Sequence, residues 1–469
     1  MLVLSLIPES KEQIMAIRSQ YPDYYLEYRL DLCNDWDFID QDTVDERVIL
    51  TLRDRSECSK DVLQKKKVSL SDKIKYYCNW IKTYNCLVDL EQSLLYKLSA
   101  PELLKLNSNN LILSIHIYDC NWNVADLARR CLDIERSNCR YTKLALASES
   151  WIKLHGIETL IRTTGSEVLV AFMGNDGLSK RCFYRHLGAE GTYVSLKGKP
   201  TAVGQLDIEL AEILRLRSIT GMHLIGGIIG GMQVVHSRGL KYFNDLFTRN
   251  ELKATYFPLI VNDLMDFTTW LSSGSRKTSC YGFSITMPYK EELADLAGKE
   301  GEVVNLWDGK KETANTDLKA MKQILKEGNI MKSDSKILIL GSGSSAKNAL
   351  QAIQGKAEIY ICSRNFPAAL ALAKEFEVEY IIPENLKGKF YNVLINTTPL
   401  GMDNEDLLDF AIGVDFDTAI DLPYRDGGTP LGKFCAEKGK DYIGGEEFWK
   451  LQSKSQEEFF ISAIRSKEI

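Results

Sequence analysis

The chain has 469 residues, of which 45% are hydrophobic and 26% charged, and its formal net charge is −6. This composition is typical of a soluble globular protein with two or three domains, and the small negative charge argues against nucleic acid as a main partner. Eleven cysteines without a C-x-x-C pair predict no metal site and no disulfide framework, which fits a reducing cytoplasm. The first residues lack the basic segment of a signal peptide, and no apolar run approaches the ~18 residues of a membrane span.

Short apolar runs recur along residues 1–205, and helical patterns separate most of them. Eight strands alternating with helices predict an α/β fold with a (β/α)8 barrel, and an open doubly wound sheet is the alternative. The runs are Leu2–Ile7, Tyr25–Cys33, Val48–Arg53, Cys86–Glu91, Leu111–Tyr118, Tyr141–Ala147, Val168–Met173 and Thr192–Leu196.

Seven charged or imidazole side chains lie at or beyond the C-terminal parts of these strands, where barrels build their sites. Taken alone, His116 would be a satisfied core histidine and Lys143 a lysine reaching out of its strand. Together the seven form a polar pocket that is costly to bury without a ligand. They are Glu27, Arg29, Arg53, Glu57, His116, Lys143 and Arg181.

The residue types suggest a reaction. An amine such as Lys143, buried in an apolar strand near other cations, loses part of the stabilisation of its charged form. A neutral amine can attack a ketone and form a Schiff base, which acidifies the neighbouring C–H group. His116, one strand away, can take that proton. Three arginines imply an anionic substrate, most simply a carboxylate.

These residues resemble those of the type I 3-dehydroquinate dehydratases, over residues 1 to about 215. The resemblance implies that Lys143 forms the Schiff base, that His116 acts as base and then as acid, and that Glu57 orients His116. It also implies a group of side chains that hold the substrate's carboxylate and hydroxyls. The matching segments are Glu27-Tyr28-Arg29, Thr51-Leu52-Arg53 with Glu57, His116 in ILSIHIYD, Lys143 in YTKLALA, Arg181 in MGNDGLSKR, Thr201 in place of a serine, and Ala202-Val203-Gly204-Gln205.

The junction between the two halves of the chain is short. Leu206–Leu216 has the apolar pattern of a helix, Ser218–Met222 is the linker, and His223–Ile229 begins a new strand. So short a connection predicts two domains in a fairly fixed relation.

Residues 220 to 466 resemble the shikimate dehydrogenases. From the residues alone, Lys290 is a surface charge and Asp317 suits a helix N-cap. The resemblance implies instead that Lys290 and Asp317 form an acid–base pair for a ketone and its alcohol. Two departures remove polar groups, since Gly239 replaces a serine and Ser284 an asparagine. The substrate-binding residues implied are Ser237, Gly239, Thr286, Asn305 and Gln452.

A glycine-rich turn lies between two apolar runs, Ile337–Leu340 and Ile359–Cys362, with a helical pattern after the turn. This order predicts a dinucleotide site, with a tight turn that binds no ligand as the alternative. Arg364 follows the second run where an acid is usual for NAD, so NADP is favoured. The cofactor-binding residues, the last three implied by the resemblance, are Gly341, Ser342, Gly343, Ser344, Ser345, Ala346, Ser363, Arg364, Asn396, Thr397 and Gly445.

As a whole the chain resembles the bifunctional 3-dehydroquinate dehydratase/shikimate dehydrogenases, which act on small molecules. Two alternatives are a second half that prefers quinate or a related polyol, and a non-catalytic sensor or repressor of the same architecture. The retention of both Lys143 and Lys290 argues against the sensor. The expected parts are a barrel (1–217), a substrate-binding domain (218–316), a Rossmann NADP-binding domain (317–445) and a C-terminal helix that returns to the substrate domain (446–469).

Overall fold

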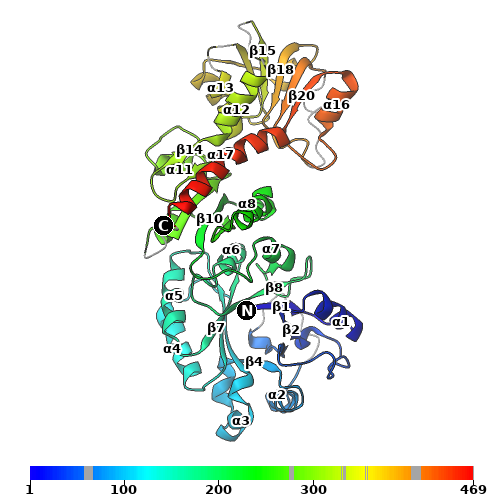
Figure 1. Cartoon of the computed structure of the whole chain (residues 1–469), viewed down its shortest axis with the longest axis vertical. Coiled ribbons are helices and arrows are strands. Elements are labelled where there is room, and N and C mark those ends of the chain that lie inside the picture. The colour runs from blue at the N-terminus through cyan, green and yellow to red at the C-terminus, as the bar shows by residue number, and fades with distance from the viewer. Residues whose placement is uncertain are drawn as a thin grey trace. The chain divides into compact units, whose positions relative to one another are not determined.

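The structure, a computed structural model, describes residues 1–57, 67–273, 279–328, 330, 334–353, 355, 357–402 and 413–467. The chain divides into two compact units, Met1–Tyr281 and Gly282–Ile469 (Figure 1).

The first unit begins with a closed barrel of eight parallel strands. They follow one another from β1 to β8, and β8 pairs with β1. A two-residue strand, Leu206–Asp207 (β9), extends β8. The predicted (β/α)8 barrel is therefore confirmed, and the open sheet is excluded for this part. The strands are Leu2–Leu6 (β1), Tyr25–Arg29 (β2), Val48–Thr51 (β3), Leu87–Glu91 (β4), Leu111–Ile117 (β5), Tyr141–Ala147 (β6), Glu167–Met173 (β7) and Gly191–Ser195 (β8).

The barrel interior changes from apolar to polar along the strands. Alternate residues of a strand face the same side, so an apolar residue that faces inward is followed two positions later by another inward residue. Val3, Ile49, Leu87, Ile112 and Tyr141 belong to one apolar cluster. The residues two positions after these five are polar and buried, and they are Ser5, Thr51, Asp89, Ser114 and Lys143.

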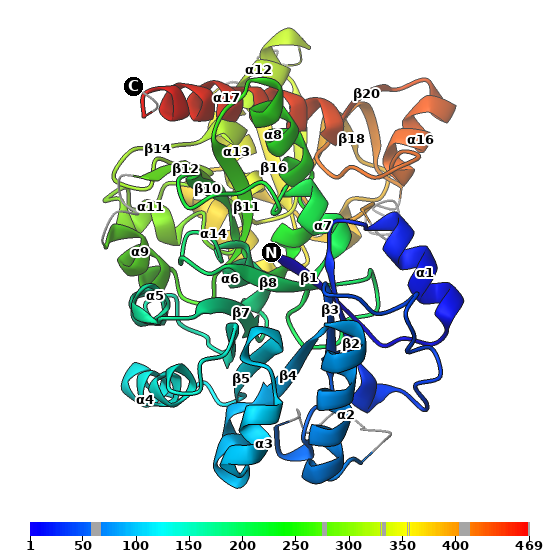
Figure 2. The ribbon, with the colours of Figure 1, turned by 60° about the horizontal axis from the view of Figure 1, so that its bottom comes forward.

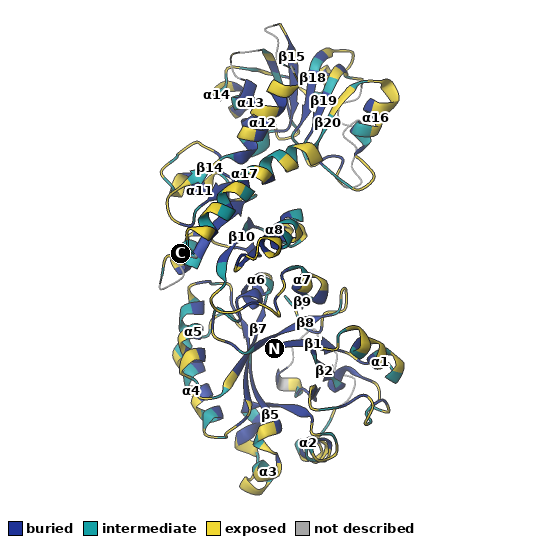
Figure 3. Ribbon diagram, viewed as in Figure 1, coloured by how far each residue is buried: buried dark blue, intermediate teal, exposed yellow. Residues whose placement is uncertain are grey.

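Helices surround the barrel strands (Figure 2). In α2, the buried residues Ile74, Tyr77 and Trp80 recur every three positions, and Ser69 caps its first turn. Such a stripe places one helix face on the sheet and leaves the other in solvent, as the colours of Figure 3 show. The helices of this part are Lys11–Gln20 (α1), Leu70–Tyr84 (α2), Ala100–Lys105 (α3), Val124–Glu135 (α4), Lys153–Thr163 (α5), Gly177–Cys182 (α6) and Ile208–Ile213 (α7).

The first unit continues with a parallel strand pair, Leu224–Gly230 (β10) and Ala254–Ile260 (β11). A helix, Arg238–Arg249 (α8), connects them and packs on β11, where the rings of Phe243 and Tyr256 lie 4.6 Å apart. Another helix, Leu264–Ser272 (α9), follows β11.

The second unit begins inside strand β12 (Cys280–Ile285), since the units divide between Tyr281 and Gly282. β12 pairs in antiparallel fashion with Leu306–Trp307 (β13), which pairs with Thr313–Ala314 (β14). Two helices accompany these strands, Glu292–Leu296 (α11) and Thr316–Glu327 (α12).

The rest of the second unit is a parallel sheet of six strands in the order β17-β16-β15-β18-β19-β20. The direction of the strand order changes at β15, which is where doubly wound sheets bind nucleotides. The elements are Lys336–Leu340 (β15), Ser344–Ile353 (α13), Glu358–Cys362 (β16), Phe366–Glu375 (α14), Glu379–Tyr380 (β17), Phe390–Asn396 (β18), Asp415–Asp421 (β19), Pro430–Lys438 (α16), Asp441–Gly444 (β20) and Gly445–Arg465 (α17).

Three sequence expectations about element bounds need correction. The expected helix Leu206–Leu216 forms only over Ile208–Ile213, because its first residues pair with β8. The strand expected to reach Cys33 ends at Arg29 and continues as a 3-10 turn. Arg53 lies beyond the end of β3, not at its last position.

Two glycines with similar backbone angles offer a test of the barrel's packing. Gly204 has φ +70°, and a Cβ atom there would lie 2.1 Å from the carbonyl oxygen of Gly174. Gly198 has φ +68°, and nothing lies within 4 Å of its Cβ position. We expect Gly198→Ala to cost about 1–2 kcal/mol from its left-handed backbone alone, and Gly204→Ala to cost more because backbone must move. Calorimetric unfolding midpoints of the two variants would check this, and equal midpoints would contradict it.

Candidate active sites

The first candidate site is a cavity of about 520 Å³ at the C-terminal ends of the barrel strands. Six of the seven residues predicted from the strand pattern line this cavity. The seventh, Glu57, lies behind His116 and contacts it. The predicted residues on the wall are Glu27, Arg29, Arg53, His116, Lys143, Arg181, Thr201 and Gln205.

Lys143 lies buried on β6 between two carboxylates. Its Nζ atom donates to Glu27 Oε1 at 3.0 Å and to Asp89 Oδ2 at 2.9 Å. The same atom lies 4.0 Å from the centre of the Tyr193 ring, a cation–π distance. The sequence interpretation foresaw cations near Lys143 but not Asp89, so it missed half of the charge environment of this amine.

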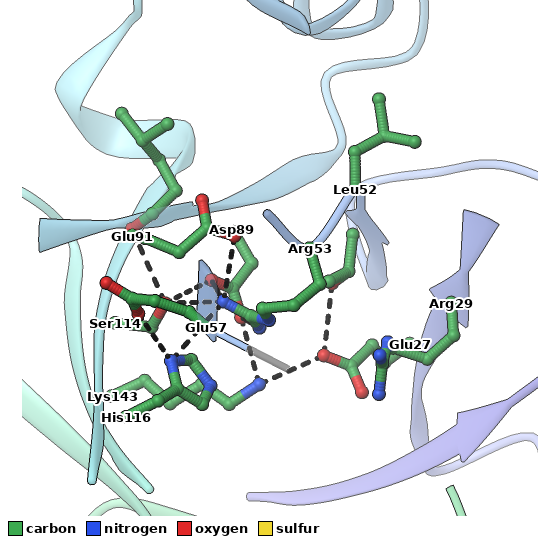
Figure 4. A network of polar contacts seen from close by, with 12 residues as sticks. Glu27, Arg29, Leu52, Arg53, Glu57, Asp89, Glu91, Ser114, His116 and Lys143 are labelled. Atoms are coloured by element: carbon green, nitrogen blue, oxygen red, sulfur yellow. Dashed lines mark hydrogen bonds and ion pairs between the residues drawn. The ribbon is translucent and has the colours of Figure 1, made fainter. Parts of the chain in front are cut away.

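Asp89 connects Lys143 to Arg53 (Figure 4). The Arg53 guanidinium donates to both oxygens of Asp89, at 2.8 and 3.2 Å, and to Ser114 Oγ at 2.9 Å. Burial alone would oppose ionisation of Asp89, but the two cations hold its pKa well below the usual value. Lys143 and Arg29 likewise hold the pKa of the buried Glu27 below its usual value. Asp89 and Glu27 are therefore ionised at neutral pH.

His116 lies on β5 beside these charges. Its Nδ1 atom is 3.2 Å from Glu57 Oε2, and Glu57 also accepts a hydrogen bond from Ser93. Burial, followed by the nearby cations Arg53 and Lys143, holds the pKa of His116 well below the ordinary histidine value. Burial raises the pKa of Glu57. The imidazole is therefore neutral at pH 7 and able to accept a proton.

The three arginines of the cavity have different partners. Arg29 forms a two-point ion pair with Asp31, at 2.9 and 3.0 Å, and Arg53 is paired with Asp89. Arg181 donates instead to two backbone carbonyls, those of Phe172 and Tyr193, at 2.7 and 3.0 Å. Burial lowers its pKa to about 10, so it stays charged at neutral pH. Within the described part of the chain no carboxylate lies within ion-pair distance of Arg181, which leaves it suited to an anionic ligand.

Thr201 and Gln205 close one side of the cavity. Gln205 Oε1 accepts from the Thr201 backbone N–H at 2.8 Å, and its Nε2 donates to the Val194 carbonyl at 3.0 Å. The Thr201 hydroxyl donates to Ser5 Oγ at 2.7 Å. Both side chains hold the loop as well as line the cavity.

The sequence interpretation missed four residues of this site. Asp89 and Glu91 alternate along β4, Ser114 precedes His116 by two positions, and Ser5 stands at the same level of β1. For Asp89, Ser114 and Ser5, the signal that could have found them is a polar residue inside a short apolar strand, two positions after an inward apolar one. Glu91 lies two positions after Asp89 on the same strand.

The second candidate site lies in the second unit, where Lys290 Nζ is 2.6 Å from Asp317 Oδ2. Lys290 follows β12, and Asp317 lies in the first turn of α12. The N-cap of α12 is Asn315, whose side chain accepts from the Leu318 N–H, so the N-cap interpretation of Asp317 is wrong.

A buried polar cluster backs this pair. The Asn305 side chain accepts from the Thr316 N–H at 2.7 Å and donates to the Thr316 hydroxyl at 2.8 Å. Gln456 of α17 accepts from Ser284 Oγ at 2.7 Å and donates to the Asn305 carbonyl at 3.3 Å. The C-terminal helix thus contacts residues of the expected substrate domain. The sequence interpretation named Gln452, which is half-buried, and missed Gln456.

The other predicted substrate residues are placed as follows. Thr286 is half-buried just after β12. In the first unit, Ser237 caps α8 by accepting from the Gly239 N–H at 3.2 Å. A Cβ atom on Gly239 would lie 3.3 Å from the Tyr256 ring and 3.2 Å from Ser237 Oγ. The glycine therefore fits a crowded position that a serine would fill only if its neighbours moved.

The glycine-rich turn lies at the C-terminal end of β15, where the strand order changes direction. Gly341 has φ +116°, and a Cβ there would lie 2.4 Å from Thr397 Oγ1, so only glycine fits. Nothing lies within 4 Å of the Cβ position of Gly343. Ser344 and Ser345 begin α13, while Ala346 is buried against the sheet. An open backbone before the N-terminus of a ten-residue helix fits a dinucleotide phosphate group.

The remaining predicted cofactor residues surround this turn. Ser363 Oγ is 3.0 Å from Ser342 Oγ, and Arg364 is exposed at the end of β16. Asn396 is buried and donates to Asp421 at 2.7 Å, and Thr397 donates to the Leu340 carbonyl at 2.7 Å. A Cβ on Gly445 would lie 2.1 Å from the Leu422 carbonyl. These last three residues therefore have a part in the fold whatever they bind.

Comparisons with known proteins agree with this geometry. The type I 3-dehydroquinase family matches residues 2–220, and the shikimate dehydrogenase substrate binding domain matches residues 229–303. A shikimate dehydrogenase (NADP(+)) from Carboxydothermus hydrogenoformans is 30% identical over 48% of this chain and 88% of its own length. The corresponding protein of Prochlorococcus marinus is 31% identical over 40% of this chain and 75% of its own length.

One relative matches across both halves. It is a bifunctional 3-dehydroquinate dehydratase/shikimate dehydrogenase, chloroplastic, from Arabidopsis thaliana, 25% identical over 393 residues. The match covers 76% of this chain and 64% of the Arabidopsis protein.

None of the helices in the described part has the length and apolar character needed to span a bilayer. Over the same residues, no three His, Cys, Asp or Glu side chains are grouped so that they could hold a metal ion.

The buried network predicts a large cost for removing one charge. Asp89→Asn removes the carboxylate that Lys143 and Arg53 share. Because breaking a buried ion pair costs ~3–5 kcal/mol, we expect this variant to lower the unfolding midpoint of the barrel by about 6 °C or more. The matched control Asp42→Asn, an exposed partner of Lys11, should cost at most about 1 kcal/mol.

The same comparison has a pH dependence. Because the folded pKa of Asp89 lies well below its usual value, its contribution is complete above about pH 4 and is lost as the pH falls further. The midpoints of the wild type and Asp89→Asn should therefore converge in acid. A constant difference from pH 7 down to acid unfolding would contradict the ionised network.

Proposed function

The chain belongs to the shikimate dehydrogenase family and carries a type I 3-dehydroquinase domain ahead of it, and from this premise we propose that one polypeptide catalyses two consecutive reactions. The first half dehydrates 3-dehydroquinate to 3-dehydroshikimate, and the second reduces 3-dehydroshikimate to shikimate with NADPH. The observation that carries the proposal is the buried amine of Lys143, held between Glu27 and Asp89 at the wall of the barrel cavity.

The proposed parts of the chain follow the sequence expectation. They are the dehydratase barrel (1–217), the substrate-binding domain (218–316), the NADP-binding domain (317–445) and the C-terminal helix (446–469). The contacts of Gln456 with Ser284 and Asn305 support a return of that helix to the substrate-binding domain.

Lys143 begins the first reaction by attacking the ketone of 3-dehydroquinate, with loss of water, to form an imine. The protonated imine carries one positive charge. Glu27 and Asp89 therefore have a cationic partner once the imine has formed, which offsets the cost of their buried charges.

His116 then removes a proton from the carbon beside the imine and returns it to the leaving hydroxyl group, which departs as water. The neutral imidazole suits the first of these steps. The contact of His116 with Glu57 fixes the orientation of the ring. It also stabilises the imidazolium that exists after the first proton transfer and before the second. Hydrolysis of the imine releases the unsaturated ketone and restores Lys143.

Arg181 is the best candidate for the substrate carboxylate, because among the described residues its guanidinium contacts two carbonyls and no acid. Arg29, Arg53, Thr201 and Gln205 line the same cavity and would contact the hydroxyl groups or shape the wall.

The second reaction uses the Lys290–Asp317 pair as proton donor and acceptor at the ketone oxygen. Asp317 holds the lysine ammonium in place, and the cluster of Asn305, Thr316 and Gln456 holds the start of α12 that carries Asp317. Ser237, Gly239, Thr286 and Gln452 complete the proposed substrate contacts.

The residues around the glycine-rich turn fit NADP. Gly341 permits the tight turn, Gly343 leaves the backbone open before α13, and Ser344 and Ser345 lie in the first turn of that helix. Arg364, at the end of β16, would contact the 2′-phosphate. When bound, NADPH supplies the hydride for the ketone carbon. A cytoplasmic place for the protein stays a prediction, since the Arabidopsis relative is named chloroplastic.

Two substitutions separate the two activities. Lys143→Ala should abolish the dehydration of 3-dehydroquinate, since no amine remains to form the imine, and leave NADP-dependent oxidation of shikimate within about twofold of the wild type. Lys290→Ala should reduce shikimate oxidation by about 10²-fold or more and leave dehydration intact. Absorbance assays of both reactions on each variant test the proposal. The dehydrogenase assay is repeated with quinate in place of shikimate and with NAD in place of NADP.

Loss of both activities in either variant, with the chain still folded, would contradict independent sites. Faster oxidation of quinate than of shikimate by the wild type would assign the second half to another polyol.

The environment of His116 predicts the acid limb of the dehydratase pH profile. The base is the neutral imidazole, and a pKa held below the usual value extends the neutral form to lower pH. The kcat/KM for 3-dehydroquinate should therefore stay flat as the pH falls from 8 through about 6.5, the ordinary histidine pKa. His116→Ala should lower kcat by about 10²–10⁴-fold. A loss of kcat/KM centred at or above pH 6.5 would contradict this assignment.

A further inference from the structure

Helix α6 of the barrel has two different neighbours. Arg181, near its end, extends to the barrel cavity and is held by carbonyls of β7 and β8. Ser179, two residues earlier, is fully buried and contacts β11, a strand of the substrate-binding half that lies 80 residues later in the chain. Within the first unit, one short helix therefore joins the barrel to the strand pair that follows it.

The contact satisfies backbone groups on the outer edge of β11. Pro258 lacks a backbone N–H, and proline is for that reason found mainly on edge strands. Its carbonyl and the Ile260 N–H still need hydrogen-bond partners. The Ser179 hydroxyl donates to the Pro258 carbonyl at 2.6 Å and accepts from the Ile260 N–H at 2.8 Å. A single hydroxyl thus meets both needs. Further along the same edge, Asn244 of α8 pairs with both backbone groups of Tyr256.

An aromatic cluster surrounds this contact. Trp151 and Phe183 come from the barrel, and Phe257 and Trp270 come from β11 and α9. Phe183 lies 4.7 Å from Phe257 and Trp151 lies 4.9 Å from Trp270, measured between ring centres. All four are buried to the degree of a domain core. Such packing resists sliding, so the two halves of this unit hold α6 in a fixed position.

The start of α6 is fixed as well. The buried Lys180 ammonium donates to Asp176 and to the Ser148 carbonyl, each at 2.6 Å. A Cβ atom on Gly177 would lie 2.8 Å from the Phe172 carbonyl, so α6 packs directly on the end of β7. Arg181 also donates to the Phe172 carbonyl. A shift of α6 away from β7 would therefore move the Arg181 guanidinium within the cavity.

We propose that Ser179 is a positioning residue for Arg181, and that strand β11 of the dehydrogenase half is the fixed support against which the dehydratase binds the carboxylate of its substrate. This inference rests on the proposed function, since it takes Arg181 as the carboxylate ligand. It assigns a role in the first reaction to a strand that lies outside the barrel.

The test compares Ser179→Ala with Ser150→Ala in the full-length chain. Ser150 donates at 2.7 Å to the Asp266 side chain of α9, so it also forms a hydrogen bond between the same two parts, but it is not on α6. Ser179→Ala should raise the KM for 3-dehydroquinate about threefold to tenfold and leave kcat within about twofold, because carboxylate binding is weakened equally in the ground and transition states. Ser150→Ala should leave both constants unchanged, and Ser179→Cys should fall between Ser179→Ala and the wild type.

Hydrogen exchange of the segment 174–186 gives a readout that needs no catalysis. The amides of α6 should exchange faster in Ser179→Ala than in Ser150→Ala. Suppose that the wild type is an active dehydratase. The inference is then overturned if Ser179→Ala changes neither KM nor the exchange of α6, or if Ser150→Ala raises KM equally, and the proposed function still stands. A wild type without dehydratase activity would overturn both.

Discussion

The barrel depends on a set of charges that can be buried only together. Lys143 and Arg53 share Asp89, and Lys143 also contacts Glu27. Each isolated charge would cost several kcal/mol to bury, and the pairs offset that cost only because strands β2, β4 and β6 bring them within about 3 Å. The closed barrel is the architecture that supplies such convergence, since its inward residues come from every strand. Fold and reactivity therefore rest on the same contacts.

A lysine beside a carboxylate occurs at both candidate sites, but with different surroundings. Lys143 is buried between two acids, and this environment suits the cationic iminium of the proposed first reaction. Within the described residues Lys290 has one acidic partner, Asp317, at 2.6 Å, and it follows β12 in the chain. One acid is enough to hold a lysine that donates a proton and takes it back. The number of neighbouring acids thus matches the different roles proposed for the two lysines.

The local sequence predicted the barrel, the Rossmann turn and most charged residues of the cavity, because period-two alternation and glycine turns are local patterns. It missed Asp89, although LVDLE shows a polar residue in an apolar strand. The partners of Asp89, Lys143 and Arg53, lie on other segments of the chain, and the local pattern does not reveal them. It placed the N-cap of α12 at Asp317 in place of Asn315, since three adjacent residues of N-T-D can all cap. Ser179 could not be found at all. Its partner is the backbone of Pro258 and Ile260, and no side-chain pattern marks a contact with backbone so distant in sequence.

The most direct measurement of the central claim is reduction by borohydride in the presence of 3-dehydroquinate, followed by mass mapping of the peptides. An imine at Lys143 would be reduced to a stable secondary amine, so the substrate-derived mass should appear on the peptide that contains Lys143 and nowhere else, with loss of dehydratase activity. An active enzyme that is neither inactivated nor modified at Lys143 under these conditions would contradict the account.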